Sequence, residues 1–322
     1  MTATVFVDAA GGHTGGAGRF RVELYEYLKR SKRADIKVIG RGRRLDSAWL
    51  LRREIGRPVH GRLVALNNVS FVAPGGERWT RLGNPLDFLT DQEWANLHPT
   101  LRRETRLRAP VVRLAARRSD VIVTPSAGMA ERVAAVMPTL RSRIIPRLNP
   151  VSPDSVPRIP REPIILCPVV FHAYKHMVAR LTEWITAVDQ HIDPAVRMIV
   201  TATSKEVPAS IAGHARIELV GSVPHAELRN LWARSQAIFF PSPIESFGFP
   251  LAEARVNGQS AIALDTPQNR EVAGPSLCGF TIGDPESVLA ATQRALAADL
   301  PPDAAPFEPN AYFEWLFGPP AA

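Results

Sequence analysis

The stretch that decides the fold runs from residue 237 to residue 254 and reads AIFFPSPIESFGFPLAEA. Its first four residues form an apolar run that predicts a buried strand, and Pro250 fits the first turn of a helix, where its missing N–H costs nothing. Gly248 lets the backbone approach a ligand closely, and the free N–H groups of a helix start suit an anion such as a pyrophosphate. Glu245 lies in the loop and Glu253 one turn into the helix, so both carboxylates can point into one cleft.

Short apolar runs alternate with helical patterns on both sides of this stretch, which is typical of stacked βαβ units. We expect strands at residues 4–7, 36–40, 63–66, 79–82, 121–124, 164–168, 198–201, 217–220, 237–240 and 260–264. We expect helices at residues 18–30, 47–55, 101–118, 126–137, 177–190, 225–235, 250–257 and 285–298. The predicted class is α/β with two open parallel sheets, and such sheets bind ligands beyond the carboxyl ends of their strands.

Proline becomes dense near the middle of the chain, at positions 146, 150, 153, 157, 160 and 163. Proline cannot continue a helix or sit in a central strand, so this stretch predicts a linker between domains. We therefore expect a first domain over residues 1–150, a linker over 151–163, a second domain over 164–305, and a tail over 306–322 that packs back on the first domain. A length of 322 residues fits two domains of roughly 150 residues each.

The charge is divided unevenly between the two halves. Residues 1–160 hold 28 Lys and Arg against 14 Asp and Glu, a net charge of +14, whereas residues 161–322 hold 11 against 17, a net charge of −6. This asymmetry indicates that the first half meets something anionic, either a membrane face or an anionic lipid acceptor, or that it is simply a basic solvated surface. Nucleic-acid binding would rest on charge alone, because no recognisable nucleic-acid motif accompanies it, so we expect no nucleic-acid partner.

The segment around Glu245 and Glu253 resembles the paired-glutamate motif of family-4 glycosyltransferases. These are retaining enzymes of the GT-B fold, in which two Rossmann-like domains face each other across a cleft. In that family a glutamate, seven residues and a second glutamate bracket a Gly-Phe-Gly-like turn, and residues 246–248 occupy that turn here. The resemblance covers nearly all of residues 160–300. The alternative is a capped helix with two solvated glutamates.

The resemblance implies a donor site for a nucleotide-diphosphate sugar. Glu245 would lie beside the donor sugar and Glu253 would hold the nucleotide ribose. A glycine-rich turn after the first strand would face the donor pyrophosphate, although such turns often only connect elements. The implied donor-binding residues are Gly15, Gly16, Ser246, Phe247, Gly248, Leu251 and Glu253.

Lys175 is the second implied catalytic residue beside Glu245. A lysine at this position can neutralise the charge that builds on a departing diphosphate. The family usually carries an arginine five or six residues earlier, where this sequence has Val169 and Val170. Either another cation such as Arg19 or Arg270 replaces it, or the activity is reduced or altered.

Acceptor-side candidates lie in the first half. Asn84 follows a predicted strand, where it would bind the sugar or acceptor or merely start a turn. His98 and Arg19 are weaker candidates of the same kind. Residues 101–118 hold seven arginines and one acid, Glu104, and Pro110 should kink or divide this helix. A basic amphipathic helix can lie on an anionic membrane, although family members often carry a basic helix here.

The sequence contains no Asp-x-Asp triplet and no clustered His/Cys ligand pattern, so we expect a metal-independent enzyme without a cofactor. We expect a retaining glycosyltransferase that moves a sugar from a nucleotide-sugar donor to a lipid-linked or polysaccharide acceptor. The rivals are a non-catalytic GT-B-like binding subunit and a GT-B-fold epimerase or phosphorylase. The start of the chain lacks the basic and apolar regions of a signal peptide, so we expect a cytoplasmic protein or one resting peripherally on the inner membrane face.

Overall fold

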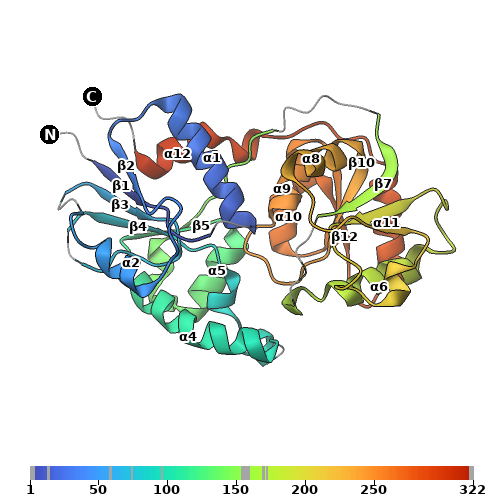
Figure 1. Cartoon of the computed structure of the whole chain (residues 1–322), viewed down its shortest axis with the longest axis horizontal. Coiled ribbons are helices and arrows are strands. Elements are labelled where there is room, and N and C mark those ends of the chain that lie inside the picture. The colour runs from blue at the N-terminus through green and yellow to red at the C-terminus, as the bar shows by residue number, and fades with distance from the viewer. Residues whose placement is uncertain are drawn as a thin grey trace. The chain divides into compact units, whose positions relative to one another are not determined.

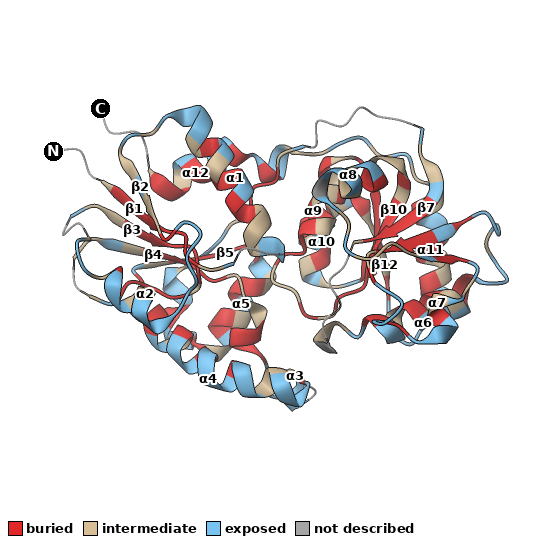
Figure 2. Cartoon of the chain, viewed as in Figure 1, coloured by how far each residue is buried: buried red, intermediate tan, exposed pale blue. Residues whose placement is uncertain are grey.

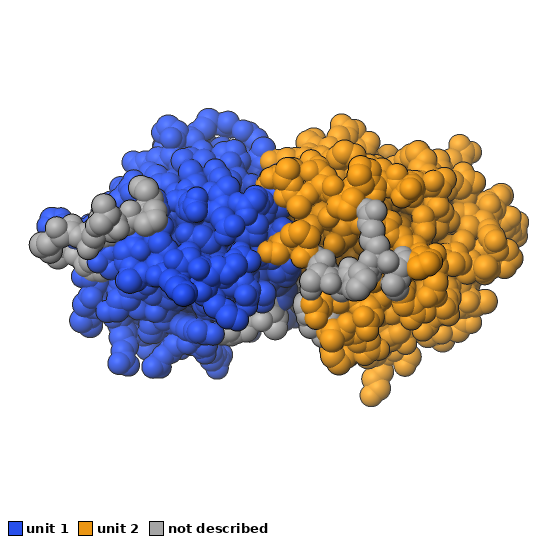
Figure 3. Space-filling model, turned by 90° about the horizontal axis from the view of Figure 1, so that it is seen from above, with its two compact units in different colours: residues 1–151, 307–322 blue, residues 152–306 orange. Residues whose placement is uncertain are grey.

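The computed structural model describes residues 4–12, 15–57, 60–73, 75–95, 97–153, 160–168, 171 and 173–318. The chain divides into two compact units, one of residues 1–151 and 307–322 and the other of residues 152–306 (Figure 3). Each unit is built on one parallel six-stranded sheet with flanking helices (Figure 1). The predicted α/β class with two parallel sheets is confirmed.

The first unit has the strand order β2-β1-β3-β4-β5-β6, and every neighbouring pair is parallel. The strands are β1 (Val5–Asp8), β2 (Ile36–Ile39), β3 (Arg62–Ala65), β4 (Glu77–Arg81), β5 (Val121–Thr124) and β6 (Ile144–Pro146). The helices are α1 (Gly15–Ser31), α2 (Ser47–Arg52), α3 (Asp91–Ala95), α4 (Pro99–Ala116), α5 (Ala127–Val136) and α12 (Pro309–Phe317), with 3-10 turns η1 (Pro85–Phe88) and η2 (Pro138–Arg143). From β1 the chain continues to β2 on one side and then crosses to β3 on the other side, so the strand order switches between β1 and β3. Open α/β sheets bind ligands at such a switch point.

Helix α12 belongs to the first unit although it lies near the end of the chain. The ring of Phe313 lies 5.6 Å from that of Phe20 and 5.1 Å from that of Tyr27, both on α1. Phe20, Tyr27 and Phe313 are all buried. Aromatic burial of this kind anchors α12 on α1 and completes the core on that face of the sheet.

The second unit has the strand order β12-β11-β10-β7-β8-β9, again parallel throughout. The strands are β7 (Glu162–Cys167), β8 (Arg197–Val200), β9 (Ile217–Leu219), β10 (Ser235–Phe240), β11 (Ser260–Leu264) and β12 (Leu277–Phe280). The helices are α6 (Met177–Val188), α7 (Ala209–Ala212), α8 (His225–Arg234), α9 (Phe249–Val256), α10 (Pro267–Ala273) and α11 (Pro285–Ala297), with 3-10 turns η3 (Ala173–Lys175), η4 (Gly274–Ser276) and η5 (Ala305–Phe307). Strands β10 and β11 are almost wholly buried, because helices cover both faces of the sheet (Figure 2).

Sequence patterning missed the strands β6 and β12 and the helices α3, α7, α10 and α12, and two prolines lie inside regular elements. Pro110 does not divide helix α4, which continues from Pro99 to Ala116, and Ala109 and Val112 on either side of the proline pack into the core. Pro163 lies inside the central strand β7, at the point where the register against β10 shifts. A proline is tolerated in a strand at such an irregularity.

Among the described residues, no helix combines the length and the apolar character needed to cross a bilayer.

Candidate active site

The turn between β10 and α9 is held in a conformation that requires glycine. Gly248 caps the start of α9 with φ 82°, in the left-handed region that other residues avoid. A Cβ at this position would lie 3.1 Å from side-chain atoms of both Leu251 and Phe240. Phe247 is buried, with its ring 5.0 Å from that of Phe249 in an edge-to-face arrangement. The turn is therefore a rigid platform at the carboxyl end of β10.

Lys175 and Glu245 meet at this platform. Strands β7 and β10 are neighbours in the sheet, and η3 and the 241–248 loop follow their carboxyl ends. The Nζ of Lys175 donates a hydrogen bond to Oε1 of Glu245 over 2.8 Å, and the two side chains are only 13% and 18% exposed. The fold thus joins two predicted catalytic residues that lie 70 positions apart in sequence.

Lys175 also shapes the electrostatics around the end of β7. Its Nζ lies 5.6 Å from the ring centre of Phe240 and 5.9 Å from that of Tyr174. Burial raises the pKa of the Cys167 thiol, and the charge of Lys175 opposes that rise. Burial and the charge of Glu245 together raise the pKa of Tyr174. Cys167 and Tyr174 are therefore neutral neighbours, and Lys175 and Glu245 carry the charge of the site.

The remaining donor-site candidates differ in what they can offer a ligand. Leu251 is fully buried and its backbone N–H donates to the carbonyl of Gly248 over 2.9 Å, so its role is to pack the turn. Ser246 and Glu253 are half-buried. Their roles toward a donor remain predictions.

Ser242 is a residue that sequence reasoning did not select. It lies between β10 and Glu245, is 3% exposed, and its hydroxyl is buried without a hydrogen-bond partner among the described residues. Buried hydroxyl groups normally have a partner. The only sequence signal was its place between Pro241 and Pro243, which excludes regular structure.

The glycine-rich turn of the first unit lies at the carboxyl end of β1. Gly15 begins α1 with φ 60°, and both Gly15 and Gly16 are exposed, with open space around Gly15. Gly12 is more tightly constrained, because a Cβ there would lie 2.8 Å from Cβ of Ala17. Arg19 is engaged by Glu23, since its Nη1 donates to Oε1 of that residue over 2.6 Å. That Gly15 and Gly16 contact a donor pyrophosphate stays a prediction.

Asn84 and His98 both mark the start of a helical turn. The side-chain oxygen of Asn84 accepts from the N–H of Leu86 over 3.1 Å, which is the turn-starting role considered above. His98 is exposed at the start of α4 and makes no capping hydrogen bond. Arg270, one suggested replacement for the family arginine, is held by Asp265 over 2.6 Å and 2.7 Å. Val169 and Val170 lie outside the described residues.

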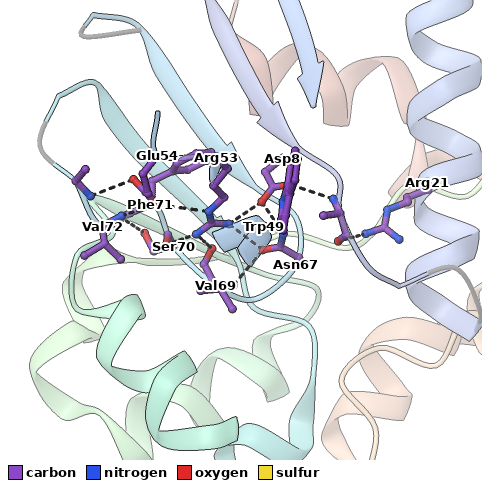
Figure 4. Close-up of polar contacts among 12 residues, drawn as sticks. Asp8, Arg21, Trp49, Arg53, Glu54, Asn67, Val69, Ser70, Phe71 and Val72 are labelled. Atoms are coloured by element: carbon purple, nitrogen blue, oxygen red, sulfur yellow. Dashed lines mark hydrogen bonds and ion pairs between the residues drawn. The ribbon is translucent and has the colours of Figure 1, made fainter. Parts of the chain in front are cut away.

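A buried polar network fills the carboxyl ends of β1 and β3, at the switch point of the first sheet (Figure 4). Nη1 of Arg53 donates to Oδ2 of Asp8 over 2.6 Å, and Nδ2 of Asn67 donates to the same oxygen over 2.7 Å. The indole N–H of Trp49 donates to Oδ1 of Asp8 over 3.1 Å. The segment that contains α2 is thereby tied to the sheet, and sequence patterning did not indicate this network.

No group of three or more His, Cys, Asp or Glu side chains that could hold a metal ion occurs within the described part of the chain.

A family comparison and solved structures of similar fold bear on the class of protein. Residues 162–298 match the family model described as glycosyl transferases group 1. No curated protein matches the sequence. Sucrose-phosphate synthase from Thermosynechococcus elongatus aligns with 98% of this chain and 95% of its own, at 15% identity and a TM-score of 0.62. The UDP-forming alpha,alpha-trehalose-phosphate synthase from Burkholderia vietnamiensis aligns with 98% of this chain and 97% of its own, at 12% identity and a TM-score of 0.61.

A third solved structure is that of a TarM variant from S. aureus, in complex with fondaparinux, alpha-GlcNAc-glycerol and UDP. It aligns with 78% of this chain at 11% identity and a TM-score of 0.52, and this chain spans 50% of that protein's length. The structural likenesses show that the chain has the GT-B fold. Together, the GT-B fold and the family match over the second unit support a glycosyltransferase.

Proposed function

We propose that the protein is a retaining glycosyltransferase that moves a sugar from a nucleotide-diphosphate sugar to an acceptor hydroxyl on a lipid-linked or polysaccharide glycan. The observation that carries this proposal is the contact of Lys175 with Glu245 beside the glycine turn at Gly248. The cation, the carboxylate and the helix start are the three groups that a sugar diphosphate needs. All three lie at the carboxyl ends of neighbouring parallel strands, where α/β sheets bind ligands.

In this proposal the ion pair has a role in each step of donor use. With no donor bound, Lys175 and Glu245 neutralise each other. When a diphosphate enters, Lys175 turns its charge toward the phosphate oxygens and Glu245 accepts hydrogen bonds from the sugar hydroxyls. Backbone N–H groups at Phe247 and Gly248 add donors, and Glu253 holds the ribose.

The chemistry needs no covalent nucleophile. The acceptor oxygen attacks the anomeric carbon on the face that the diphosphate leaves, so the configuration is retained. The bond from that carbon to the phosphate oxygen breaks as the bond to the acceptor oxygen forms, and the acceptor proton passes to the departing diphosphate. Catalysis then comes from positioning and from stabilisation of the leaving group by Lys175.

The first experiment separates the two glutamates. A thermal-shift panel of nucleoside diphosphates and nucleotide-sugars identifies the donor, because a ligand at 100 times its dissociation constant stabilises the folded protein by roughly 2.7 kcal/mol. Glu253→Ala should mainly weaken nucleotide binding, whereas Glu245→Ala should mainly lower turnover. Glu227→Ala on α8 is the control, because Glu227 is exposed in the same unit. Equal and small effects of Glu245→Ala and Glu253→Ala would count against the assignment.

The valines at 169 and 170 motivate one rival, a non-catalytic binding subunit, and the rival enzyme is an epimerase or a phosphorylase. Release of free nucleoside diphosphate, measured with and without acceptor, distinguishes them from a transferase. A transferase releases nucleoside diphosphate in step with acceptor glycosylation. Binding without release would leave the binding subunit as the better description.

We propose further that the acceptor is reached at an anionic membrane surface through the outer face of α4. Leu107, Val111 and Leu114 are spaced along one side of the helix, and they are 72%, 53% and 66% exposed. Figure 2 shows exposed stretches along α4. Arg103 lies one turn before this apolar stripe. The face is bordered by exposed arginines that pair with no carboxylate in the described part of the chain: Arg103, Arg106, Arg117 and Arg118.

This combination suits a bilayer, because the apolar side chains can enter the headgroup region while the arginines contact anionic lipids. The protein should bind liposomes that contain phosphatidylserine but not purely neutral ones, and added salt should weaken the binding. The double variant Val111→Ser with Leu114→Ser should bind anionic liposomes more weakly than the wild type at the same salt concentration. Val178→Ser, which changes an exposed valine of α6, should bind them like the wild type. If the wild-type protein ignores anionic liposomes at low salt, a soluble acceptor replaces the lipid-linked one.

A further inference from the structure

Four arginines are buried in the described part of the chain, and two of them have no carboxylate partner. Arg53 pairs with Asp8 over 2.6 Å, and Arg216 pairs with Asp189 over 3.3 Å. Arg21 on α1 and Arg81, the last residue of β4, are each 6% exposed and form no ion pair with a described residue. A buried charge without a counter-ion is costly, so this pair needs an explanation.

Both guanidinium groups are engaged only by neutral groups. Arg21 donates through Nη1 to the carbonyl of Gly12 and through Nη2 to that of Ala10 over 2.9 Å, while its Nε is buried without a partner. Arg81 donates through Nε and Nη2 to Oδ1 of Asn149, over 3.2 Å and 3.0 Å. Its guanidinium carbon lies 4.3 Å from the ring centre of Phe20. These contacts orient the two groups without cancelling their charge.

The two charges also act on each other. Burial lowers the pKa of both guanidinium groups. At Arg81 the nearby Tyr312 opposes this fall in pKa, and the charge of Arg21 adds to it. Asp8 is close enough to attract Arg21, but its carboxylate is already shared by Arg53 and Asn67. Arginine nevertheless stays charged in proteins. This part of the first unit therefore holds two like charges that form no ion pair with a described carboxylate, and an added anion would balance them.

The location fits a ligand site. Arg21 reaches back to the glycine turn that follows β1, and Arg81 ends β4, so both lie at the carboxyl edge of the first sheet. A Cβ at Gly12 would lie 2.9 Å from Nη1 of Arg21, and one at Gly83 would lie 2.8 Å from Nη1 of Arg81. Glycine at both positions thus leaves room for the guanidinium groups.

We propose that Arg21 and Arg81 form a phosphoryl-binding subsite in the first unit. A phosphate oxygen pair matches the planar fork of a guanidinium group, and a dianion balances both charges. Under the proposed glycosyltransferase function, on which the source of the ligand depends, this phosphoryl group belongs either to the nucleotide donor or to a phosphorylated acceptor.

The test uses the full-length protein and inorganic phosphate as the probe, against chloride at equal ionic strength. Thermal shift and titration calorimetry should show phosphate-specific stabilisation of the wild type. Arg21→Gln and Arg81→Gln should each weaken phosphate binding by about tenfold or more, the loss expected for one charge-assisted hydrogen bond. Arg30→Gln removes the same charge from an exposed position of α1 and should leave phosphate binding unchanged.

A folding control, a variant that keeps the charge and a competition experiment complete the test. Circular dichroism establishes that each variant is folded, and Arg81→Lys, which keeps the charge, should retain part of the phosphate affinity. Competition between phosphate and a bound nucleoside diphosphate would assign the subsite to the donor, and simultaneous binding would assign it to the acceptor. No phosphate-specific stabilisation, or a stabilisation lost in Lys175→Ala but kept in Arg21→Gln and Arg81→Gln, would overturn the proposal.

The glycosyltransferase proposal fails by a different result. It fails if no nucleoside diphosphate binds in a manner that Glu253→Ala weakens. Phosphate binding that depends on Arg21 and Arg81 would still stand in that case.

Discussion

The buried pair of Arg53 and Asp8 allows a prediction whose size follows from the structure. Replacing Arg53 with Met keeps most of the side-chain volume but removes the cation beside a carboxylate that is fully buried. Asp8 would keep three neutral donors, the N–H of Ala10, the indole of Trp49 and the amide of Asn67. Breaking a buried pair costs about 3–5 kcal/mol. The three donors that Asp8 keeps lower this cost, whereas the carbonyls of Val69 and Ser70 lose the donor that Arg53 supplies, so we expect a loss of about 3 kcal/mol or more.

The thermal midpoint should fall accordingly. A unit of this size loses about 2–4 °C for each kcal/mol, so the midpoint of the first unit should drop by about 6–12 °C. Thermal unfolding followed by circular dichroism measures the drop, and the fluorescence of Trp49 reports on the network itself. Arg78→Met is the matched control, because Arg78 pairs with Asp120 at the surface, where such pairs contribute at most about 1 kcal/mol.

A double-mutant cycle supplies the decisive comparison. Asp8→Asn in the Arg53→Met background removes the charge that the first change leaves unpaired. The double variant should therefore be more stable than Arg53→Met alone by about 1–2 kcal/mol. If the two changes instead add, so that the double variant is the least stable protein, the reasoning about a buried unpaired carboxylate is refuted.

Three further predictions concern other parts of the molecule. Burial raises the pKa of Asp87 against the opposing charge of Arg108, so the folded protein favours the protonated acid. As the pH rises from the ordinary carboxyl value near 3.8 toward neutrality, the wild type should therefore lose stability relative to Asp87→Asn. Urea unfolding measures both proteins across this pH range, and a stability difference that does not change with pH would exclude the prediction. Gly248→Ala should destabilise the second unit by about 1–2 kcal/mol and weaken nucleotide binding, because φ is 82° at this position. Gly283→Ala, at φ 79° with open space around it, should lower stability without weakening nucleotide binding. Denaturation and nucleotide-binding curves of both variants measure the two effects. Glycosyl transfer should survive EDTA, and an activity lost to EDTA and restored by magnesium or manganese would overturn the metal-free proposal.

Much of the architecture could be predicted because local patterns encode it. Apolar runs such as residues 237–240 and 260–264 predicted strands buried on both faces, and the structure confirms β10 and β11 there. Glycine and proline at fixed places predicted the turn before α9, because few residues tolerate that backbone. The missed strands β6 and β12 are edge strands without an uninterrupted apolar run, because β6 ends at Pro146 and β12 contains Gly279.

The contacts within the site were decided only by the tertiary structure. Lys175 and Glu245 meet because β7 and β10 are neighbours, and no local pattern encodes strand order. Packing of α1 against β4 likewise brings Arg81 to within 4.3 Å of the ring centre of Phe20, the residue before Arg21. The composition showed that the first half is basic. Only the structure shows which of its arginines are exposed to solvent and which, such as Arg21 and Arg81, are buried without an ion-pair partner. A sequence specifies each side chain and its local backbone, whereas the packing of distant elements determines which side chains share a site.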